Sequence, residues 1–155
     1  MGVSVLAAIR PDDVDIALLA HVAGAMILVG GLVTAGTALA VGWRDTGVTA
    51  LRLGYFTLLA VALPGYIIMR IGAEWTYVEE GWDDVEDEPG WIGIGYITAD
   101  LGALLLLLGL ILGGIGVRRL RNGGGGGLLK ATTVITLVLV AAYVVAVWAM
   151  SGKPD

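Results

Sequence analysis

The chain has no cysteine, a single histidine and few charged residues. Without cysteine, disulfides, thiolate metal sites and cysteine nucleophiles are all excluded. Because His21 is the one histidine, a site with two histidine ligands cannot form within one chain. Charged residues occupy 15% of the 155 positions, whereas a soluble domain usually has about 25%. The shortages of cysteine and histidine exclude these kinds of site, and the shortage of charge is typical of a chain that lies in a membrane.

Four long apolar runs contain little of the charge. Hydrophobic residues make up 57% of the chain, and the runs cover residues 14–42, 52–72, 91–117 and 128–150. A helix needs about 20 apolar residues to cross a bilayer core about 30 Å thick. We therefore predict an all-α fold in which residues 1–155 form a single membrane domain, an antiparallel bundle of four transmembrane helices. Pro64 lies in the middle of the second run, where we expect it to kink the helix.

An acidic segment, residues 73–90, separates the second run from the third. We expect this segment to be a solvated loop outside the membrane. Trp75, Tyr77, Trp82 and Trp91 fit a belt of aromatic residues at the membrane surface. A hard cation such as Ca²⁺ could bind the carboxylates, but the segment lacks the alternating spacing and the closing glutamate of an EF-hand.

The positively charged residues predict the orientation of the bundle. The first and third loops hold six of the nine lysines and arginines: Arg44, Arg52, Arg118, Arg119, Arg121 and Lys130. Loops rich in such residues stay in the cytoplasm. Both termini and the acidic loop then face outward, and the small, helix-dense plan suits a bacterial plasma membrane. The net charge of −5 comes largely from the acidic loop and does not suggest binding to nucleic acid.

Three ionisable residues fall inside the apolar runs: His21, Arg70 and Asp100. A charge in the middle of a membrane costs about 2.5–3.5 kcal/mol, so such residues usually serve a function. At the rise of an α-helix, Arg70 lies about 7 Å below Trp75 and Asp100 about 13 Å below Trp91. His21 lies about 7–10 Å below the start of its helix. We therefore expect a cluster in the outer half of the bilayer, in which Arg70 neutralises Asp100 and His21 lies nearby.

The cluster has structural and functional interpretations. Tyr96, one turn from Asp100, could donate a hydrogen bond to it. In a structural interpretation, the Arg70–Asp100 pair locks two helices in register while His21 bonds to a backbone carbonyl. In another, Arg70 pairs with Glu74 and extends toward the lipid headgroups. Our leading prediction is a non-catalytic membrane protein whose polar cluster serves binding, assembly or structure. An alternative is a proton or ion conductor that uses Asp100 and Arg70.

Small residues recur on two of the predicted helices. Gly24, Gly31 and Ala35 lie on or near the face of His21, and Gly109 and Gly113 form a small-xxx-small pair. Such residues let helix backbones approach closely. We expect them to serve helix packing within the bilayer, and they could also serve a homo-oligomer or another membrane partner. We predict no catalytic residue and no metal site; the methionines Met26, Met69 and Met150 are interpreted as lipid-facing or packing residues.

The stretch LLAHVAGAMILVGGL, residues 18–32, resembles the first helix of small bacterial membrane proteins of the copper-resistance protein D superfamily. In those proteins a histidine is followed by a Gly-Gly pair, which His21 and Gly30-Gly31 match here. A tryptophan often precedes that pair, where this chain has Leu28 and Val29. In relatives such as the four-helix bacterial protoporphyrinogen oxidase, the bundle is thought to hold haem. The resemblance thus implies a haem-binding or redox protein with His21 as an axial ligand, and a methionine or another chain would supply the second ligand.

Overall fold

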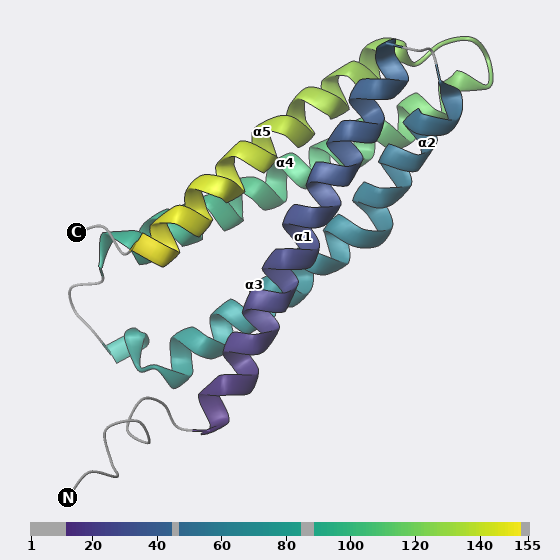
Figure 1. The fold of residues 1–155 in the computed structure, drawn as a ribbon. Helices are drawn as coiled ribbons and strands as arrows, with labels where there is room; N and C mark the ends of the chain where they lie inside the picture. The colour runs from purple at the N-terminus through teal and green to yellow at the C-terminus, as the bar shows by residue number, and fades with distance from the viewer. Residues whose placement is uncertain (1–11, 45–46, 85–88, 153–155) are drawn as a thin grey trace, which may run out of the picture.

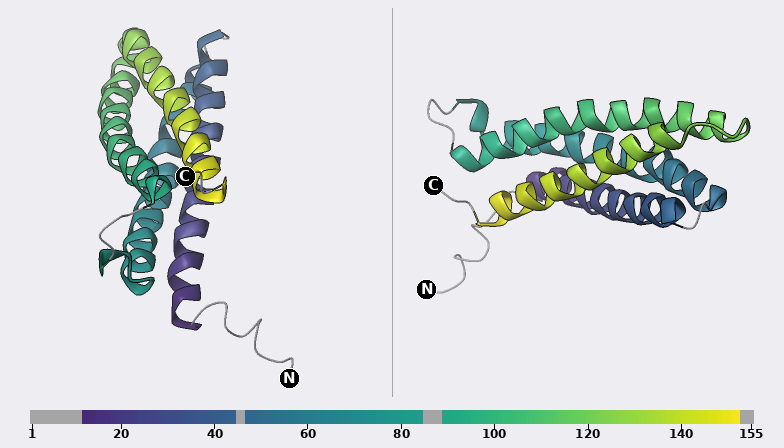
Figure 2. Two further views of the ribbon diagram at one scale, coloured as in Figure 1. Left: turned by 90° about the vertical axis from the view of Figure 1, so that its left-hand side faces the viewer. Right: turned by 90° about the horizontal axis from the view of Figure 1, so that it is seen from above.

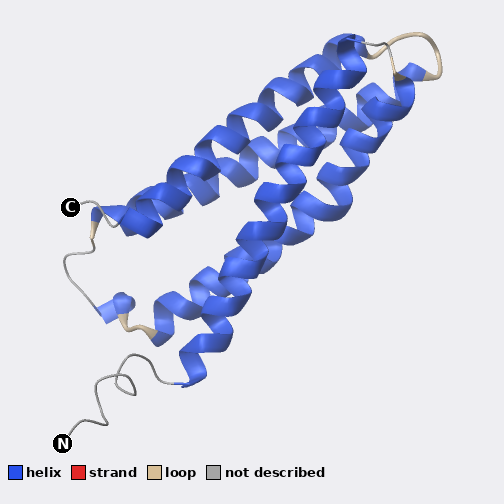
Figure 3. Ribbon diagram, in the orientation of Figure 1, coloured by secondary structure: helices blue, strands red, loops and turns tan. Residues whose placement is uncertain are grey.

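The computed structural model describes residues 12–44, 47–84 and 89–152, and in these residues it contains helices and no strand. Four helical rods run back and forth along the molecule (Figure 1, Figure 3). Their elements are α1 (Asp12–Arg44), α2 (Val48–Thr57) continued by η1 (Leu58–Ala62) and α3 (Leu63–Glu79), α4 (Gly90–Leu120) and α5 (Gly126–Gly152), with the short 3₁₀ turn η2 (Trp82–Asp84) before α4. Each rod is long and apolar enough to cross a membrane. The predicted all-α, antiparallel bundle of four transmembrane helices is confirmed.

The second rod is longer than the sequence suggested. It begins at Val48, before the expected start at residue 52, and it continues to Glu79. The expectation that the loop begins at residue 73 is therefore wrong. Two pairs spaced four residues apart stabilise the extra turns, because Arg70 contacts Glu74 at 3.0 Å and the indole of Trp75 donates to Glu79. Gly81 then ends the helix with a positive φ of 73°, and residues 85–88 of the acidic segment lie outside the described residues.

Pro64 perturbs the second rod just before its own position. Proline has no backbone N–H, and its ring clashes with the carbonyl one turn earlier. The five residues Leu58–Ala62 are π-helical, and the N–H of Leu63 bonds to the carbonyl of Leu58, five residues back. The effect expected of Pro64 therefore takes the form of a local π-helix, which lets the rod continue in spite of the missing donor.

The four rods form two pairs that pack tightly at one end and diverge at the other. The α1 helix lies along α3, and α4 lies along α5 (Figure 1, Figure 2). The pairs meet where α1 contacts α5 and α2 contacts α4, whereas α3 scarcely touches α4. The start of α1, the end of α5 and η2 share the diverging end (Figure 1). Fully buried leucines fill the packed region, among them Leu28, Leu32, Leu39, Leu58 and Leu139.

The predicted small-residue faces pack within the chain. A Cβ atom at Gly24 would overlap the backbone of Met69, and one at Gly72 would overlap the backbone of His21. The absence of side chains at these two glycines allows α1 and α3 to touch backbone to backbone. Gly113 likewise packs against the ring of Tyr55. These faces are occupied inside the bundle, and assembly with a further chain stays a prediction.

Candidate functional site

A cavity of about 790 Å³ lies where the two helix pairs diverge. All four rods and η2 contribute to its wall, with Tyr143 of α5 and Met69 of α3 at depth and Trp82 and Trp91 near the acidic segment. Small-molecule sites in proteins usually measure about 300–1,000 Å³. The cavity therefore has the volume of a ligand site, and it lies at the end of the bundle to which the sequence assigned the polar cluster.

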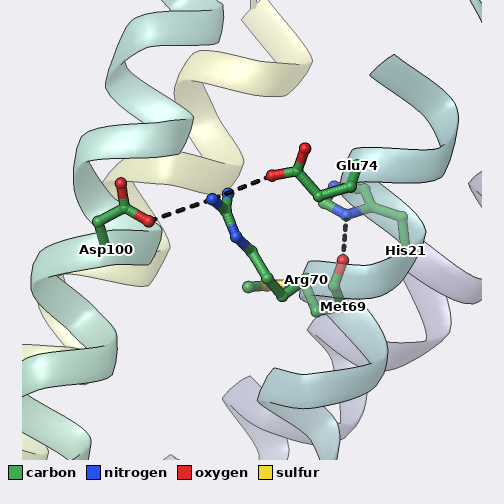
Figure 4. A network of polar contacts seen from close by, with 5 residues as sticks. All are labelled: His21, Met69, Arg70, Glu74 and Asp100. Atoms are coloured by element: carbon green, nitrogen blue, oxygen red, sulfur yellow. Dashed lines mark hydrogen bonds and ion pairs between the residues drawn. The ribbon is translucent and has the colours of Figure 1, made fainter. Parts of the chain in front are cut away.

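Arg70 reaches from α3 toward α4, where Figure 4 shows it between Asp100 and Glu74, and it also contacts Tyr96. Its Nη2 atom lies 3.3 Å from Oδ1 of Asp100 and 3.0 Å from Oε1 of Glu74. The guanidinium carbon lies 4.7 Å from the ring centroid of Tyr96. The pairings with Asp100 and with Glu74, considered as alternatives from the sequence, thus occur together. One arginine faces two carboxylates, which leaves this group with a net negative charge.

His21 lies on the same cavity wall but bonds to a different group. Its Nδ1 atom is 3.0 Å from the backbone carbonyl of Met69, the residue before Arg70 (Figure 4). A carbonyl oxygen only accepts, so Nδ1 carries the proton and Nε2 is not needed for this bond. The structure therefore places His21 beside the cluster, with Arg70 and Tyr96 also lining the cavity, while Asp100 and Glu74 flank Arg70 outside the lining.

Two buried hydroxyl groups in the cavity wall were not predicted. Thr76 is 9% exposed and Tyr143 is 5% exposed, and neither hydroxyl has a hydrogen-bond partner in the described part of the structure. Both residues line the cavity. By contrast, Thr133 and Thr136 in α5 donate to the carbonyls four residues earlier, at 2.9 and 2.8 Å. Leaving a buried hydroxyl unsatisfied costs about 1–3 kcal/mol, so each group would gain from a hydrogen-bond partner. Both oxygens are covered by neighbouring atoms, so a ligand reaches them only when those neighbours shift.

Sequence patterns gave only a faint signal for these two residues. Threonine in a helix usually bonds to the preceding turn, and nothing in the sequence marks Thr76 as different. Tyr143 is the one tyrosine in α5, where the surrounding run is otherwise rich in valine and alanine. A tyrosine inside such a run needs a hydrogen-bond partner for its hydroxyl. This requirement was the one feature of the sequence that indicated Tyr143 as a candidate site residue.

The mouth of the cavity is aromatic. Trp82 and Trp91 meet edge to face with ring centroids 5.9 Å apart, and Tyr77 and Tyr96 do so at 5.5 Å. All four rings line the cavity. Three residues assigned to an aromatic belt therefore also form the entrance of a site, whereas the fourth, Trp75, is 44% exposed and is not part of the lining.

The methionines agree with their interpretation as packing or lipid-facing residues, and they also line the cavity. Met69 is buried at 6% exposure and packs against Gly24, whereas Met26 is 72% exposed. Together with Met150, both contribute to the cavity wall. Thioether side chains are flexible and polarisable, so they adapt to ligands of irregular shape.

No family model, curated protein or solved structure matches this chain. The resemblance of residues 18–32 to the copper-resistance protein D superfamily stays a prediction. The helices define a multi-pass membrane protein, and the cavity with its polar residues is the basis on which its function can be inferred.

Proposed function

We propose that this protein is a non-catalytic membrane protein that binds an amphipathic small molecule or lipid between the α1–α3 and α4–α5 pairs. The observation that carries this proposal is a cavity of about 790 Å³ whose wall contains two buried hydroxyls without partners among the described residues. In the orientation that the positive residues predict, the cavity opens toward the outer side of a bacterial plasma membrane.

The distribution of side chains in the cavity matches a ligand with one polar and one apolar part. Apolar side chains such as Met26, Val29 and Val147 provide wall area for a hydrocarbon body. Arg70, Thr76 and Tyr143 are polar residues of the same wall, and the two covered hydroxyls become available to a ligand when the atoms around them shift. Gly102 packs against the Tyr143 hydroxyl, two residues beyond Asp100, which puts this hydroxyl deep in the bundle. Thr76 lies nearer to the mouth, so a bound molecule can meet polar groups at two depths.

A pair of matched substitutions tests this function. In neutral detergent, native mass spectrometry measures the fraction of protein that retains glycerol monolaurate as a one-to-one adduct. Thr76→Val and Tyr143→Phe should each lower the affinity by about threefold to tenfold, because one hydrogen bond contributes about 0.5–1.5 kcal/mol.

The controls are Thr133→Val and Tyr66→Phe. Thr133 is buried and bonded within α5, and Tyr66 is absent from the cavity lining. Equal adduct levels in the cavity variants and the controls would contradict the proposed site, as would a wild-type protein that retains no amphiphile.

A haem protein is the second candidate, and the hydrogen bond of His21 favours it. Histidines that bind metals usually donate their other ring N–H to a carbonyl or carboxylate, as His21 does to Met69. Met26, in the same cavity, could supply a second ligand. The charge fits less well, because haem carries two propionates. Arg70 is the one lysine or arginine among the described lining residues, and it already contacts two carboxylates.

Absorption spectroscopy separates haem from the other candidates. A haem protein purified in mild detergent should show a Soret band that His21→Ala abolishes. A folded, colourless protein that binds glycerol monolaurate would favour the amphiphile instead.

Ion conduction by Asp100 and Arg70 is the third candidate. Leucines that are fully buried, including Leu28, Leu32 and Leu139, lie deeper in the bundle than this pair. Charged groups are strongly disfavoured in such surroundings. Flux measurements in liposomes test this function, and a proton or ion flux lost in Asp100→Asn would support it.

A further inference from the structure

The mouth of the cavity combines negative charge with aromatic rings. Glu80 lines the mouth and accepts a hydrogen bond of 2.9 Å from the indole of Trp82. Glu74 and Asp100 both contact Arg70. These four ionisable residues carry one positive and three negative charges, so the region attracts cations and repels anions. An anionic head would also have to compete with two carboxylates for Arg70.

A cation already lies on one of the aromatic rings. The guanidinium of Arg70 is 4.7 Å from the centroid of Tyr96, within the roughly 6 Å at which a cation is attracted to a ring face. Tyr77 contacts Tyr96 edge to face, and Trp82 and Trp91 form the second pair. Several aromatic rings around one space are the usual means by which proteins recognise ammonium groups, and tryptophan is the most effective of them.

We propose that the ligand is a single-chain amphipathic cation, with an ammonium-type head at the mouth and a hydrocarbon chain in the cavity. This inference rests on the proposed function and adds the chemical class of the ligand to it. The head lies among Trp82, Trp91 and Glu80, where it gains attraction from both the rings and the carboxylate. The chain extends past Met26 and Val29 toward Tyr143. The cavity volume of about 790 Å³ accommodates one such molecule.

Three probes that share a twelve-carbon chain test this assignment on the full-length protein in neutral detergent. They are the dodecyltrimethylammonium cation, neutral glycerol monolaurate and anionic laurate. We expect the cation to bind at least about tenfold more tightly than laurate, with glycerol monolaurate between them. The preference should decrease as salt is added, because salt screens the charges at an exposed mouth.

Matched variants locate the effect in the mouth. Glu80→Gln and Trp82→Leu should each weaken binding of the cation by about threefold to tenfold and leave the affinity for glycerol monolaurate within about twofold. The controls are Glu79→Gln and Trp75→Leu, because these residues interact with each other and do not line the cavity. Arg52, Arg118 and Arg121 line a smaller pocket in the other half of the bundle. Laurate bound there would be unaffected by Trp82→Leu.

Each outcome bears on one of the two proposals. A preference for the cation that depends on Glu80 and Trp82 supports the inference. Equal affinities for the three probes, or a preference for laurate, would overturn the inference and leave the amphiphile site in place. If none of the three probes binds, the proposed function itself is wrong.

Discussion

The two ends of the bundle consist of the same four rods but are closed by different interactions. At the end where α1 stops and α2 starts, apolar packing dominates, with Leu39, Leu51 and Leu129 all buried. At the other end the helix pairs separate, and Arg70 and Asp100 link α3 to α4 across the gap (Figure 4). Close packing thus fixes one end, whereas the other has room for a ligand.

The two ends of the bundle also differ in charge, and glycines keep α1 and α3 in contact at the open end. Arginines line a pocket of about 310 Å³ near the packed end, whereas Glu80 lines the mouth of the larger cavity, with Glu74 and Asp100 flanking Arg70 outside the lining. The α1–α3 pair nevertheless stays in backbone contact past the point of divergence, through Gly24 and Gly72. The bundle is therefore open at this end because the two helix pairs separate from each other, while the helices within each pair stay packed together.

The largest effect is expected from breaking the α1–α3 contact. Gly24→Val places side-chain atoms where the backbone of Met69 lies, and neither helix can move without disturbing the other. Overpacking of this kind should lower the free energy of unfolding by about 1–3 kcal/mol. Thermal unfolding in detergent, followed by circular dichroism, measures the change.

Gly30→Val is the control for this substitution. Gly30 is on the same helix, and a Cβ atom there would have no neighbour within 4 Å among the described residues. If both variants unfold at the same temperature, the α1–α3 pair is not the rigid unit that the comparison of the two ends requires.

Much of the bundle and part of the site follow from the sequence because they depend on local quantities. Span number depends on run length, and the depths of Arg70 and Asp100 depend on the fixed rise of a helix. The depths of about 7 and 13 Å put both residues in the outer half of the bilayer, with a difference that an arginine side chain can span. The sequence also indicated that Glu74, one turn from Arg70, was within reach.

The remaining features depend on how helices pack against one another. The apolar runs do not predict that α3 scarcely touches α4. The cavity exists because these two helices are separated. Thr76 and Tyr143 became candidates only when their hydroxyls were found buried and without partners in the described structure. The extension of α3 to Glu79 was missed because acidic residues were interpreted as loop, although pairs four residues apart stabilise them in a helix.

A smaller effect is expected at His21, where α1 and α3 meet beside the cavity. His21→Phe removes the hydrogen bond to the Met69 carbonyl and keeps a ring of similar size. Loss of one such bond should reduce the free energy of unfolding by about 0.5–1.5 kcal/mol. Thermal unfolding measures it, and His21→Asn should restore part of the loss if its amide reaches the same carbonyl. An unchanged stability in His21→Phe would show that glycine packing alone holds this part of the pair.

The smallest effect concerns the one ion pair seen between the two helix pairs in the described residues. The side chain of Asp100 is 65% exposed and that of Arg70 is 28% exposed, so solvent and headgroups weaken their attraction. A double-mutant cycle with Arg70→Gln and Asp100→Asn should give a coupling of about 0.5–1 kcal/mol in the free energy of unfolding. The same cycle with Arg70→Gln and Glu74→Gln is a control within α3, because that pair does not join the helix pairs.

Distances between spin labels on α3 and α4 distinguish the Arg70–Asp100 contact from the Arg70–Glu74 contact. They should lengthen when Asp100 is changed and stay the same when Glu74 is changed. Additive stabilities together with unchanged distances would mean that helix packing sets the width of the cavity, and that the Arg70–Asp100 contact follows from it.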